Sequence, residues 1–148
     1  MKNVQFKLIK PIEHLERILD LLQQLNPEME LKRLEKIQLR MAQLPNYICF
    51  GLFLNDELVG ISSGWTTVRI YCGKQLELDN VIIDSQMQSR GFGKYFMNVI
   101  KNWSVNNDYE SLSLNTYVQN SRSHKFYFNE GFKILGFHFE NRISLHEH

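Results

Sequence analysis

The chain has 148 residues, a formal net charge of +1 and a hydrophobic content of 43%. This length suits one compact core and is short for two, so we expect a single domain over residues 1–148. The balanced charge offers no basic excess for nucleic acid, and the apolar runs are far shorter than a membrane span. We therefore expect a cytoplasmic protein with a small-molecule ligand, and no nucleic-acid or membrane partner.

The N-terminus and the two cysteines are consistent with this expectation. Residues 1–6 alternate polar and apolar side chains like a strand and lack the apolar core of a signal peptide. Cys49 and Cys72 stand in strand-like segments without the spacing of metal ligands. We predict that both are buried thiols rather than a disulfide, and that the protein has no metal site.

The first half of the chain carries alternating patterns of period two and helical patterns of period 3.6. Asn26-Pro27 and Pro45 each stop a helical pattern, and Asn55-Asp56-Glu57 reads as a hairpin turn. The patterns predict a strand that starts at Val4 and ends at Pro11, helices over 12–25 and 29–43, and antiparallel strands over 47–54, 58–68 and 75–83.

The second half alternates helices and strands. A helix over 91–105 separates strand 75–83 from a strand over 111–117, so these two strands should lie parallel with a right-handed crossover. A short helix to about Asn129 and a strand over 132–139 complete the chain. The predicted class is mixed α/β, with a mostly antiparallel sheet in the order β-α-α-β-β-β-α-β-α-β.

The segment between strand 75–83 and the next helix is the strongest candidate for a ligand site. The first N–H groups of that helix lack partners within the helix, and the helix dipole adds positive potential there. Gly91 and Gly93 leave the backbone open to a bulky group such as a diphosphate. The third glycine of the dinucleotide fingerprint and the Lys-Ser or Lys-Thr of a P-loop are both missing from this turn.

Two motifs in this region resemble the GNAT superfamily of N-acetyltransferases. Gln88-Ser89-Arg90-Gly91-Phe92-Gly93 matches the superfamily pattern Gln/Arg-x-x-Gly-x-Gly/Ala. The run from Asn120 to Phe132 is similar to the second signature, Asn-x-x-Ala-x-x-Phe/Leu-Tyr-x-x-x-Gly-Phe, with Ser123 in place of alanine. Both motifs stand in the family's order, separated by one strand, and the predicted element order also resembles the GNAT fold.

The resemblance implies acetyl-CoA as cosubstrate and assigns roles to individual residues. Asn120 would help to hold the cofactor arm, and Tyr127 would contact the cofactor and protonate the departing thiolate. A phenol with a pKa near ~10 can supply that proton when it lies within hydrogen-bond reach. The cofactor arm would bind the backbone of Val81, Ile82 and Ile83, and the pyrophosphate would bind Gln88, Ser89, Arg90, Gly91, Phe92, Gly93 and Lys94.

The general base is left open between several residues. An amine arrives mostly protonated, so a group must accept its proton before attack on the thioester. Asp79 stands where some family members carry a catalytic carboxylate, and Glu77 would share its face of the strand. A bulge in this strand would change that facing, and Asp79 could instead be satisfied by neighbouring backbone donors. His124 and His138 are the other candidates.

The expected activity is direct transfer of an acetyl group to a primary amine in a ternary complex, because neither cysteine has a visible activating partner. The alternative is a non-catalytic module that binds coenzyme A for regulation or sensing, and another acyl donor is also open. We expect residues 25–30 and 139–142 to bound the acceptor. The acceptor itself stays open between a small amine, an amino acid, an antibiotic and a protein. The oligomeric state also stays open, between a monomer and a homodimer.

Overall fold

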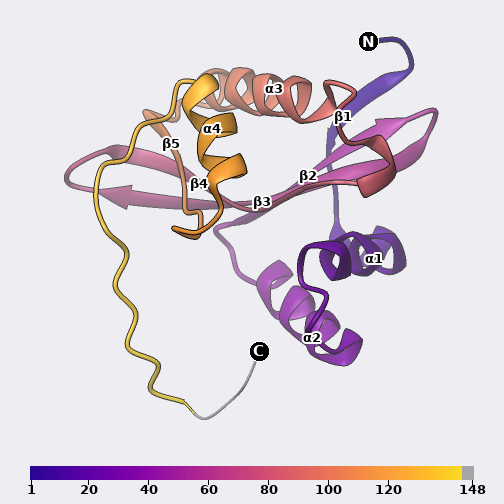
Figure 1. Cartoon of the computed structure of the whole chain (residues 1–148), viewed down its shortest axis with the longest axis horizontal. Coiled ribbons are helices and arrows are strands. Elements are labelled where there is room, and N and C mark those ends of the chain that lie inside the picture. The colour runs from indigo at the N-terminus through magenta and orange to yellow at the C-terminus, as the bar shows by residue number, and fades with distance from the viewer. Residues whose placement is uncertain (145–148) are drawn as a thin grey trace.

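The computed structural model describes residues 1–144, which form a twisted sheet between two pairs of helices (Figure 1). Helices α1 and α2 cover one face of the sheet, and α3 and α4 lie on the other. The elements are β1 (Val4–Leu8), the 3₁₀ turn η1 (Pro11–His14), α1 (Leu15–Leu25), α2 (Leu31–Ala42), β2 (Tyr47–Leu54), β3 (Glu57–Arg69), β4 (Gly73–Ile83), the 3₁₀ turn η2 (Ser85–Met87), α3 (Phe92–Asn106), β5 (Ser111–Leu114) and α4 (Ser121–Asn129).

The five strands lie in sequence order, β1-β2-β3-β4-β5. The first four pair antiparallel, and β5 pairs parallel to β4 after the crossover through α3. This is the mixed, mostly antiparallel α/β class that the sequence predicted. Within the described residues, no helix is long and apolar enough to cross a membrane.

A hydrophobic core lies on each face of the sheet because strand side chains alternate between the faces. On β2, Cys49 and Phe53 pack with the helix pair α1 and α2, whereas Phe50 and Leu52 pack towards α3. Phe96 of α3 is fully buried in this second core. Burial of each such large side chain contributes roughly 1.5–3 kcal/mol, so both faces hold the strands in register. Cys49 and Cys72 are free thiols, as predicted, although Cys72 is only partly buried.

Strand β4 contains a bulge directly after Asp79. Ile82 pairs with Ile61 of β3, but the next pair along the strands is Asp79 with Ser63. Two residues of β4 therefore oppose one residue of β3, and Asn80 takes a left-handed conformation with φ of 52°. A bulge bends the strand and increases its local twist. The sequence reading had allowed for such a bulge, and the structure contains it.

Strands β4 and β5 separate at the same point. Their pairing begins at Gln75 with Ser111 and ends at Leu78 with Leu114. From Asp79 to Ile83, β4 is paired with β3 only, so its other edge has no strand beside it in the described part of the chain. Strand β5 is accordingly shorter than the predicted strand over 111–117.

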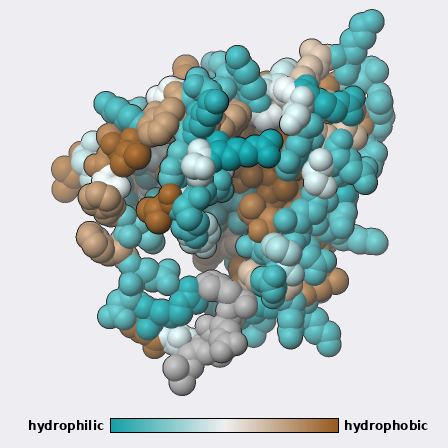
Figure 2. Space-filling view, viewed as in Figure 1, coloured by the Kyte–Doolittle hydropathy of each residue, from teal (hydrophilic) through white to brown (hydrophobic). Residues whose placement is uncertain are grey.

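The predicted strand over 132–139 is wrong, because the structure has no regular element there. The segment after α4 runs around the outside of the molecule, away from the sheet (Figure 1). Ile134, Leu135, Phe137 and Phe139 are 72–91% exposed. Their pattern favours a strand, but a strand needs a neighbour that pairs with its backbone, and the pattern cannot supply one. On the face shown in Figure 2, apolar side chains come to the surface in patches between mainly hydrophilic side chains.

Candidate functional site

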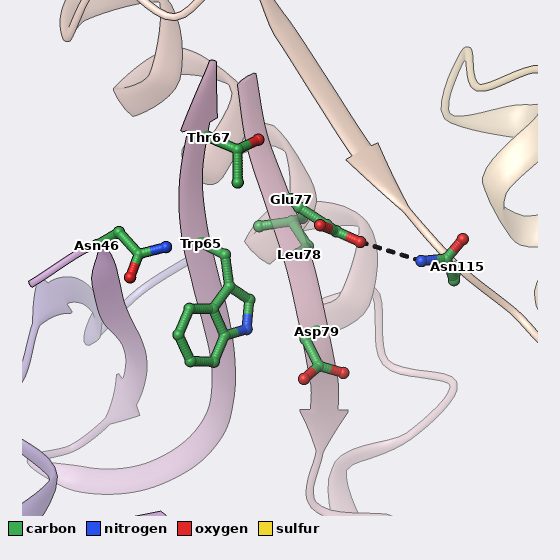
Figure 3. Close-up of a pocket in the computed structure, with 7 residues that line it drawn as sticks. All are labelled: Asn46, Trp65, Thr67, Glu77, Leu78, Asp79 and Asn115. Carbon is green, nitrogen blue, oxygen red and sulfur yellow. Dashed lines mark hydrogen bonds between the residues drawn. The ribbon is translucent and has the colours of Figure 1, made fainter. Parts of the chain in front are cut away.

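A pocket of about 440 Å³ opens where β4 and β5 separate (Figure 3). Trp65 of β3 is paired with Glu77 of β4, and this register brings the indole beside the carboxylates of β4. The volume is within the usual range for small-molecule sites. The lining residues are Asn46, Trp65, Thr67, Glu77, Leu78, Asp79 and Asn115.

The pocket carries negative charge. Glu77 and Asp79 both line it, as expected for two residues that share one face of a strand. The Asn115 amide donates a hydrogen bond of 3.0 Å to Glu77 Oε1 and so links β5 to β4 at the edge of the pocket. None of the seven lining residues is basic. A positively charged guest would therefore meet two carboxylates without a competing cation from the lining.

Asp79 lines the pocket as an exposed residue, yet neighbouring protein atoms partly desolvate its carboxyl. Desolvation by these atoms raises its pKa, and interactions with the Asn80 backbone N–H and the Trp65 side chain lower it by less. The Asn80 side chain also donates to Asp79 Oδ2 at 3.3 Å. The net upward shift in pKa makes Asp79 a stronger base than a fully solvated aspartate.

The turn that follows β4 ends in an uncapped helix. Gly91 is the N-cap of α3, has a left-handed φ of 84°, and provides no side-chain hydrogen bond to the helix start. The first helical hydrogen bond runs from the Tyr95 N–H to the Gly91 carbonyl at 3.1 Å. The N–H groups of Phe92, Gly93 and Lys94 therefore have no partner inside the helix and are available to an anion.

The two glycines of this turn differ in what a side chain would meet. At Gly91 an added Cβ would lie 3.2 Å from the Met1 methyl group, in a backbone conformation that favours glycine. At Gly93 an added Cβ would make only ordinary contacts of 3.8 Å with the Phe126 ring. The surrounding protein thus does not require glycine at 93, and the open space lies at the start of α3.

The side chains of the turn are mostly directed to solvent. Gln88, Ser89, Arg90 and Lys94 are exposed, whereas Phe92 is buried in the core and can offer a ligand only its backbone. The Arg90 guanidinium contacts Met87 Sδ at 3.1 Å and lies over the Phe92 ring. Two cationic side chains thus flank the free N–H groups, an arrangement that suits a diphosphate.

Tyr127 lies on α4 between two aromatic rings. Its ring centroid is 5.2 Å from that of Phe126 and 5.6 Å from that of Phe132. Burial raises the pKa of the Tyr127 phenol, so it carries its proton throughout the neutral range. Among the described residues, the structure gives its hydroxyl no hydrogen-bond partner.

The remaining candidates have structural contacts of their own. Asn120 Oδ1 accepts a 3.2 Å hydrogen bond from the Ser123 N–H and caps α4. His124 Nε2 lies 2.8 Å from the Tyr117 carbonyl oxygen. His138 is exposed on the segment after α4, and neither histidine lines the pocket. The pocket also contains no residue of 25–30 or 139–142, so the expectation that these segments bound the acceptor stays a prediction.

Sequence reasoning missed Trp65, Asn115, Asn46 and Thr67 as lining residues. They come from β3, from the residue before β2, and from the residue after β5. Only the pairing of β3 with β4 brings Trp65 opposite Glu77. The indole itself carries no signal in the sequence, although counting from the turn between Arg69 and Gly73, which joins β3 to β4, could have suggested the register.

Comparisons with known proteins agree with this geometry. The family model described as Acetyltransferase (GNAT) family matches residues 15–132. An uncharacterized N-acetyltransferase, YhdJ of Bacillus subtilis (strain 168), is 25% identical over 121 residues, which cover 81% of this chain and 82% of the relative.

Two solved structures show the same fold at low identity. A possible acetyltransferase from Clostridium difficile 630 superposes with a TM-score of 0.83 at 15% identity, covering 98% of this chain and 100% of that one. The aminoglycoside N-acetyltransferase AAC(6')-Iy, solved in complex with CoA, has a TM-score of 0.78 at 17% identity, with 94% and 93% coverage. Because the family model spans most of the sequence, this chain belongs to the GNAT family of acetyltransferases.

Proposed function

We propose that the protein transfers the acetyl group of acetyl-CoA to a primary amine by direct attack in a ternary complex. The observation that carries this proposal is the free edge of β4 from Asp79 to Ile83. One end of this edge lies at the carboxylate pocket, and the other leads into the turn before the uncapped start of α3. A cofactor with a diphosphate at one end and a thioester at the other can span the two.

The backbone of β4 supports the cofactor assignment. About half of the N–H and C=O groups of Val81, Ile82 and Ile83 face β3, and the rest face the unpaired edge. An extended arm that contains amides would satisfy the groups on the unpaired edge. The pyrophosphate would then reach the free N–H groups of Phe92, Gly93 and Lys94, with Gln88, Ser89, Arg90 and Gly91 in the preceding turn, and Asn120 and Tyr127 would contact the arm from the side of α4.

Tyr127 is proposed as the general acid. When the amine attacks the thioester carbonyl, the carbon–sulfur bond breaks and the thiolate leaves with the electron pair. The raised pKa of the buried phenol keeps it protonated until that step. Transfer of the Tyr127 proton to sulfur releases coenzyme A as a neutral thiol, and the second proton that the nitrogen loses as the amide forms returns to the Tyr127 phenolate through water.

Asp79 is proposed as the general base, directly or through water. Its raised pKa increases its basicity, and its place in a pocket with a second carboxylate attracts an ammonium group. Once the ammonium has lost a proton to Asp79, the free amine can attack the thioester. Glu77 is engaged with Asn115 and is better placed to hold charge than to remove a proton.

The same two carboxylates indicate the class of acceptor. Residues two apart on a strand are separated by roughly 7 Å, which is twice the rise per residue. A guest with a second ammonium group at about that spacing would satisfy both carboxylates, and the Trp65 ring could add a cation–π contact. We therefore propose an acceptor with more than one amine.

The test is a panel of amines incubated with acetyl-CoA while free thiol is measured. Diamines with four- to six-atom spacers are expected to react with a lower KM than matched monoamines, and Glu77→Gln is expected to remove that preference. If the protein binds acetyl-CoA but releases no thiol with any of these amines, the result would instead support a non-catalytic coenzyme-A-binding module.

A further inference from the structure

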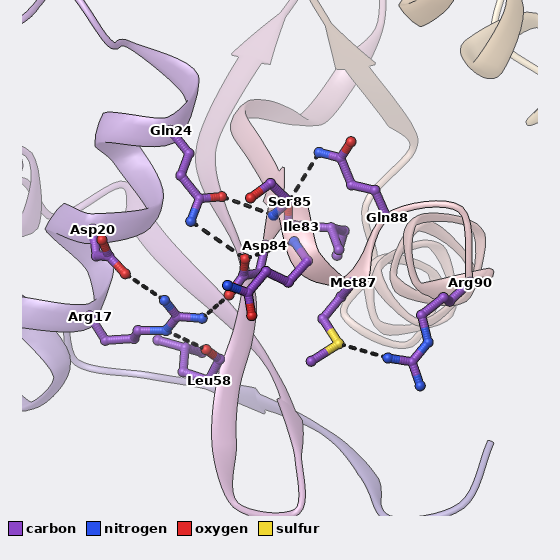
Figure 4. Close-up of polar contacts among 11 residues, drawn as sticks. Arg17, Asp20, Gln24, Leu58, Ile83, Asp84, Ser85, Met87, Gln88 and Arg90 are labelled. Atoms are coloured by element: carbon purple, nitrogen blue, oxygen red, sulfur yellow. Dashed lines mark hydrogen bonds and ion pairs between the residues drawn. The ribbon is translucent and has the colours of Figure 1, made fainter.

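A polar cluster connects α1 to the start of the segment between β4 and α3, residues 84–91, which we call the cofactor turn (Figure 4). Arg17 Nη2 forms an ion pair with Asp84 Oδ2, at the residue directly after β4. Arg17 Nε donates a 2.8 Å hydrogen bond to the Leu58 carbonyl, and Nη1 contacts Asp20 Oδ2 at 2.6 Å. Each of the three guanidinium nitrogens thus has a hydrogen-bond partner within the protein.

Asp84 is 7% exposed and connects α1 with the backbone of the turn. Its Oδ1 accepts a 3.1 Å hydrogen bond from the Gln86 N–H, which caps η2, and a longer contact of 3.5 Å from Gln24 Nε2. The Asp84 N–H donates to the Val59 carbonyl at 2.8 Å. A buried carboxylate is costly unless it is paired and hydrogen-bonded, and this one meets both conditions.

Gln24 makes a second connection from the same helix. Its Oε1 accepts a 2.9 Å hydrogen bond from the Ser85 N–H, one residue further into the turn. Two side chains of α1 therefore hold consecutive residues that lie 60 or more positions later in the chain. Contacts of this range form only when α1 packs on the sheet.

The two halves of the turn are held differently. The entry, residues 84–87, is anchored to α1 and β3 by the contacts above, and the Asp84 side chain caps its 3₁₀ turn η2. The exit, residues 88–91, has exposed side chains and left-handed conformations at Ser89 and Gly91. A ligand at the start of α3 would contact the exit, residues 88–91. The conformation of the exit depends in turn on where the entry is held.

We propose that Arg17, Gln24 and Asp84 are positioning residues that hold the cofactor turn in its binding conformation before acetyl-CoA arrives. This inference rests on the proposed binding of acetyl-CoA at the turn. Ordering a loop in advance lowers the entropic cost of binding and so raises affinity without any new ligand contact. Loss of the cluster is therefore expected to weaken cofactor binding and to leave the chemical step unchanged at saturation.

The experiment titrates acetyl-CoA calorimetrically into the wild-type protein, Asp84→Asn, Arg17→Met, Gln24→Ala and the control Asp20→Asn. Asp20 contacts the same guanidinium but not the turn, and its side chain is 62% exposed. We expect Kd to rise about tenfold or more for the first three variants, as for loss of a hydrogen bond to a charged group, and to stay constant for the control. With an accepted amine, KM for acetyl-CoA should rise at constant kcat.

Melting curves separate positioning from stability. Gln24 is exposed, so Gln24→Ala keeps the test valid if Asp84→Asn fails to fold. Unchanged affinity in folded Gln24→Ala and Asp84→Asn, even with lower melting points, would overturn the inference and leave the proposed function intact. Failure of the wild-type protein to bind acetyl-CoA would overturn the proposed function, and this inference with it.

Discussion

Substitutions of Gly93 test whether the start of α3 is shaped for a ligand or for the fold. A Cβ at this position would touch only the Phe126 ring, at 3.8 Å, and Gly93 does not have a left-handed φ. Alanine should therefore fit, and its higher helix propensity is worth up to ~1 kcal/mol. The melting point of Gly93→Ala is expected to stay constant or to rise.

Cofactor affinity is expected to fall only with a larger side chain, because the superfamily pattern itself accepts alanine at this position. The side chain of Gly93→Leu would occupy space beside the unpaired N–H groups of Phe92, Gly93 and Lys94, where we place the pyrophosphate. Loss of one charge-assisted hydrogen bond costs about 1.5–3 kcal/mol, which raises Kd for acetyl-CoA by roughly 10- to 150-fold. Gly93→Ala, which is expected to bind acetyl-CoA as the wild-type protein does, is the control for side-chain size.

Gly91 provides the contrast. Its φ of 84° is left-handed, so a β-branched residue there is strained by about 1–2 kcal/mol or more. Gly91→Val should lower the melting point and also abolish tight binding, while the fold persists. Gly131→Ala, with φ of 91° and no neighbour within 4 Å of its Cβ, is the control that introduces similar strain away from the turn.

The assay is calorimetric titration of each variant with acetyl-CoA, run beside a thermal melt. Gly131→Ala is expected to melt lower and to bind acetyl-CoA as the wild-type protein does. A Gly93→Leu protein that is folded and has an unchanged Kd would refute the assignment of the pyrophosphate to the start of α3.

Three further predictions concern single side chains. Tyr127→Phe is expected to lower turnover by ~10² or more with little change in cofactor affinity, as measured by thiol release, and equal rates for the two proteins would remove Tyr127 as the acid. Asp79→Asn is expected to lower the rate at neutral pH and to move the plateau of the pH–rate profile upward, towards the pKa of the free amine; an unshifted profile with a lower melting point would make Asp79 structural. Burial opposes ionisation of Asp84, but the hydrogen bonds from Arg17 and the Gln86 N–H outweigh it and hold its pKa below the ordinary value of 3.8. The ionised Asp84 carboxylate therefore contributes its full stabilisation above pH 3.8, and this stabilisation is lost as the pH falls through the lower pKa of the folded state. The melting-point difference between wild type and Asp84→Asn should accordingly be constant down to about pH 5 and should shrink below about pH 4.

Much of the fold could be read from local patterns. The strand Tyr47–Leu54 was predicted to the residue, the first strand begins at Val4 as predicted but ends before Pro11, and the helix after Gly91 starts within one residue of its predicted position. These elements have strong periodicity, and their ends carry Pro, Gly or Asn residues that act over one or two positions. The glycine turn before α3 was predicted for the same reason, because its glycines and the helix start are neighbours in the chain.

The pocket and the cluster at Asp84 were decided by tertiary structure. Trp65 reaches Glu77 through the register of two strands, and Arg17 reaches Asp84 because α1 packs on the end of β4. Local periodicity carries no information about either pairing, because it shows which face a side chain lies on and not which residue of another element lies opposite. The segment 132–139 shows the converse: its alternation predicts a strand, but a strand exists only where another backbone accepts its hydrogen bonds, and that partner is a property of the folded molecule.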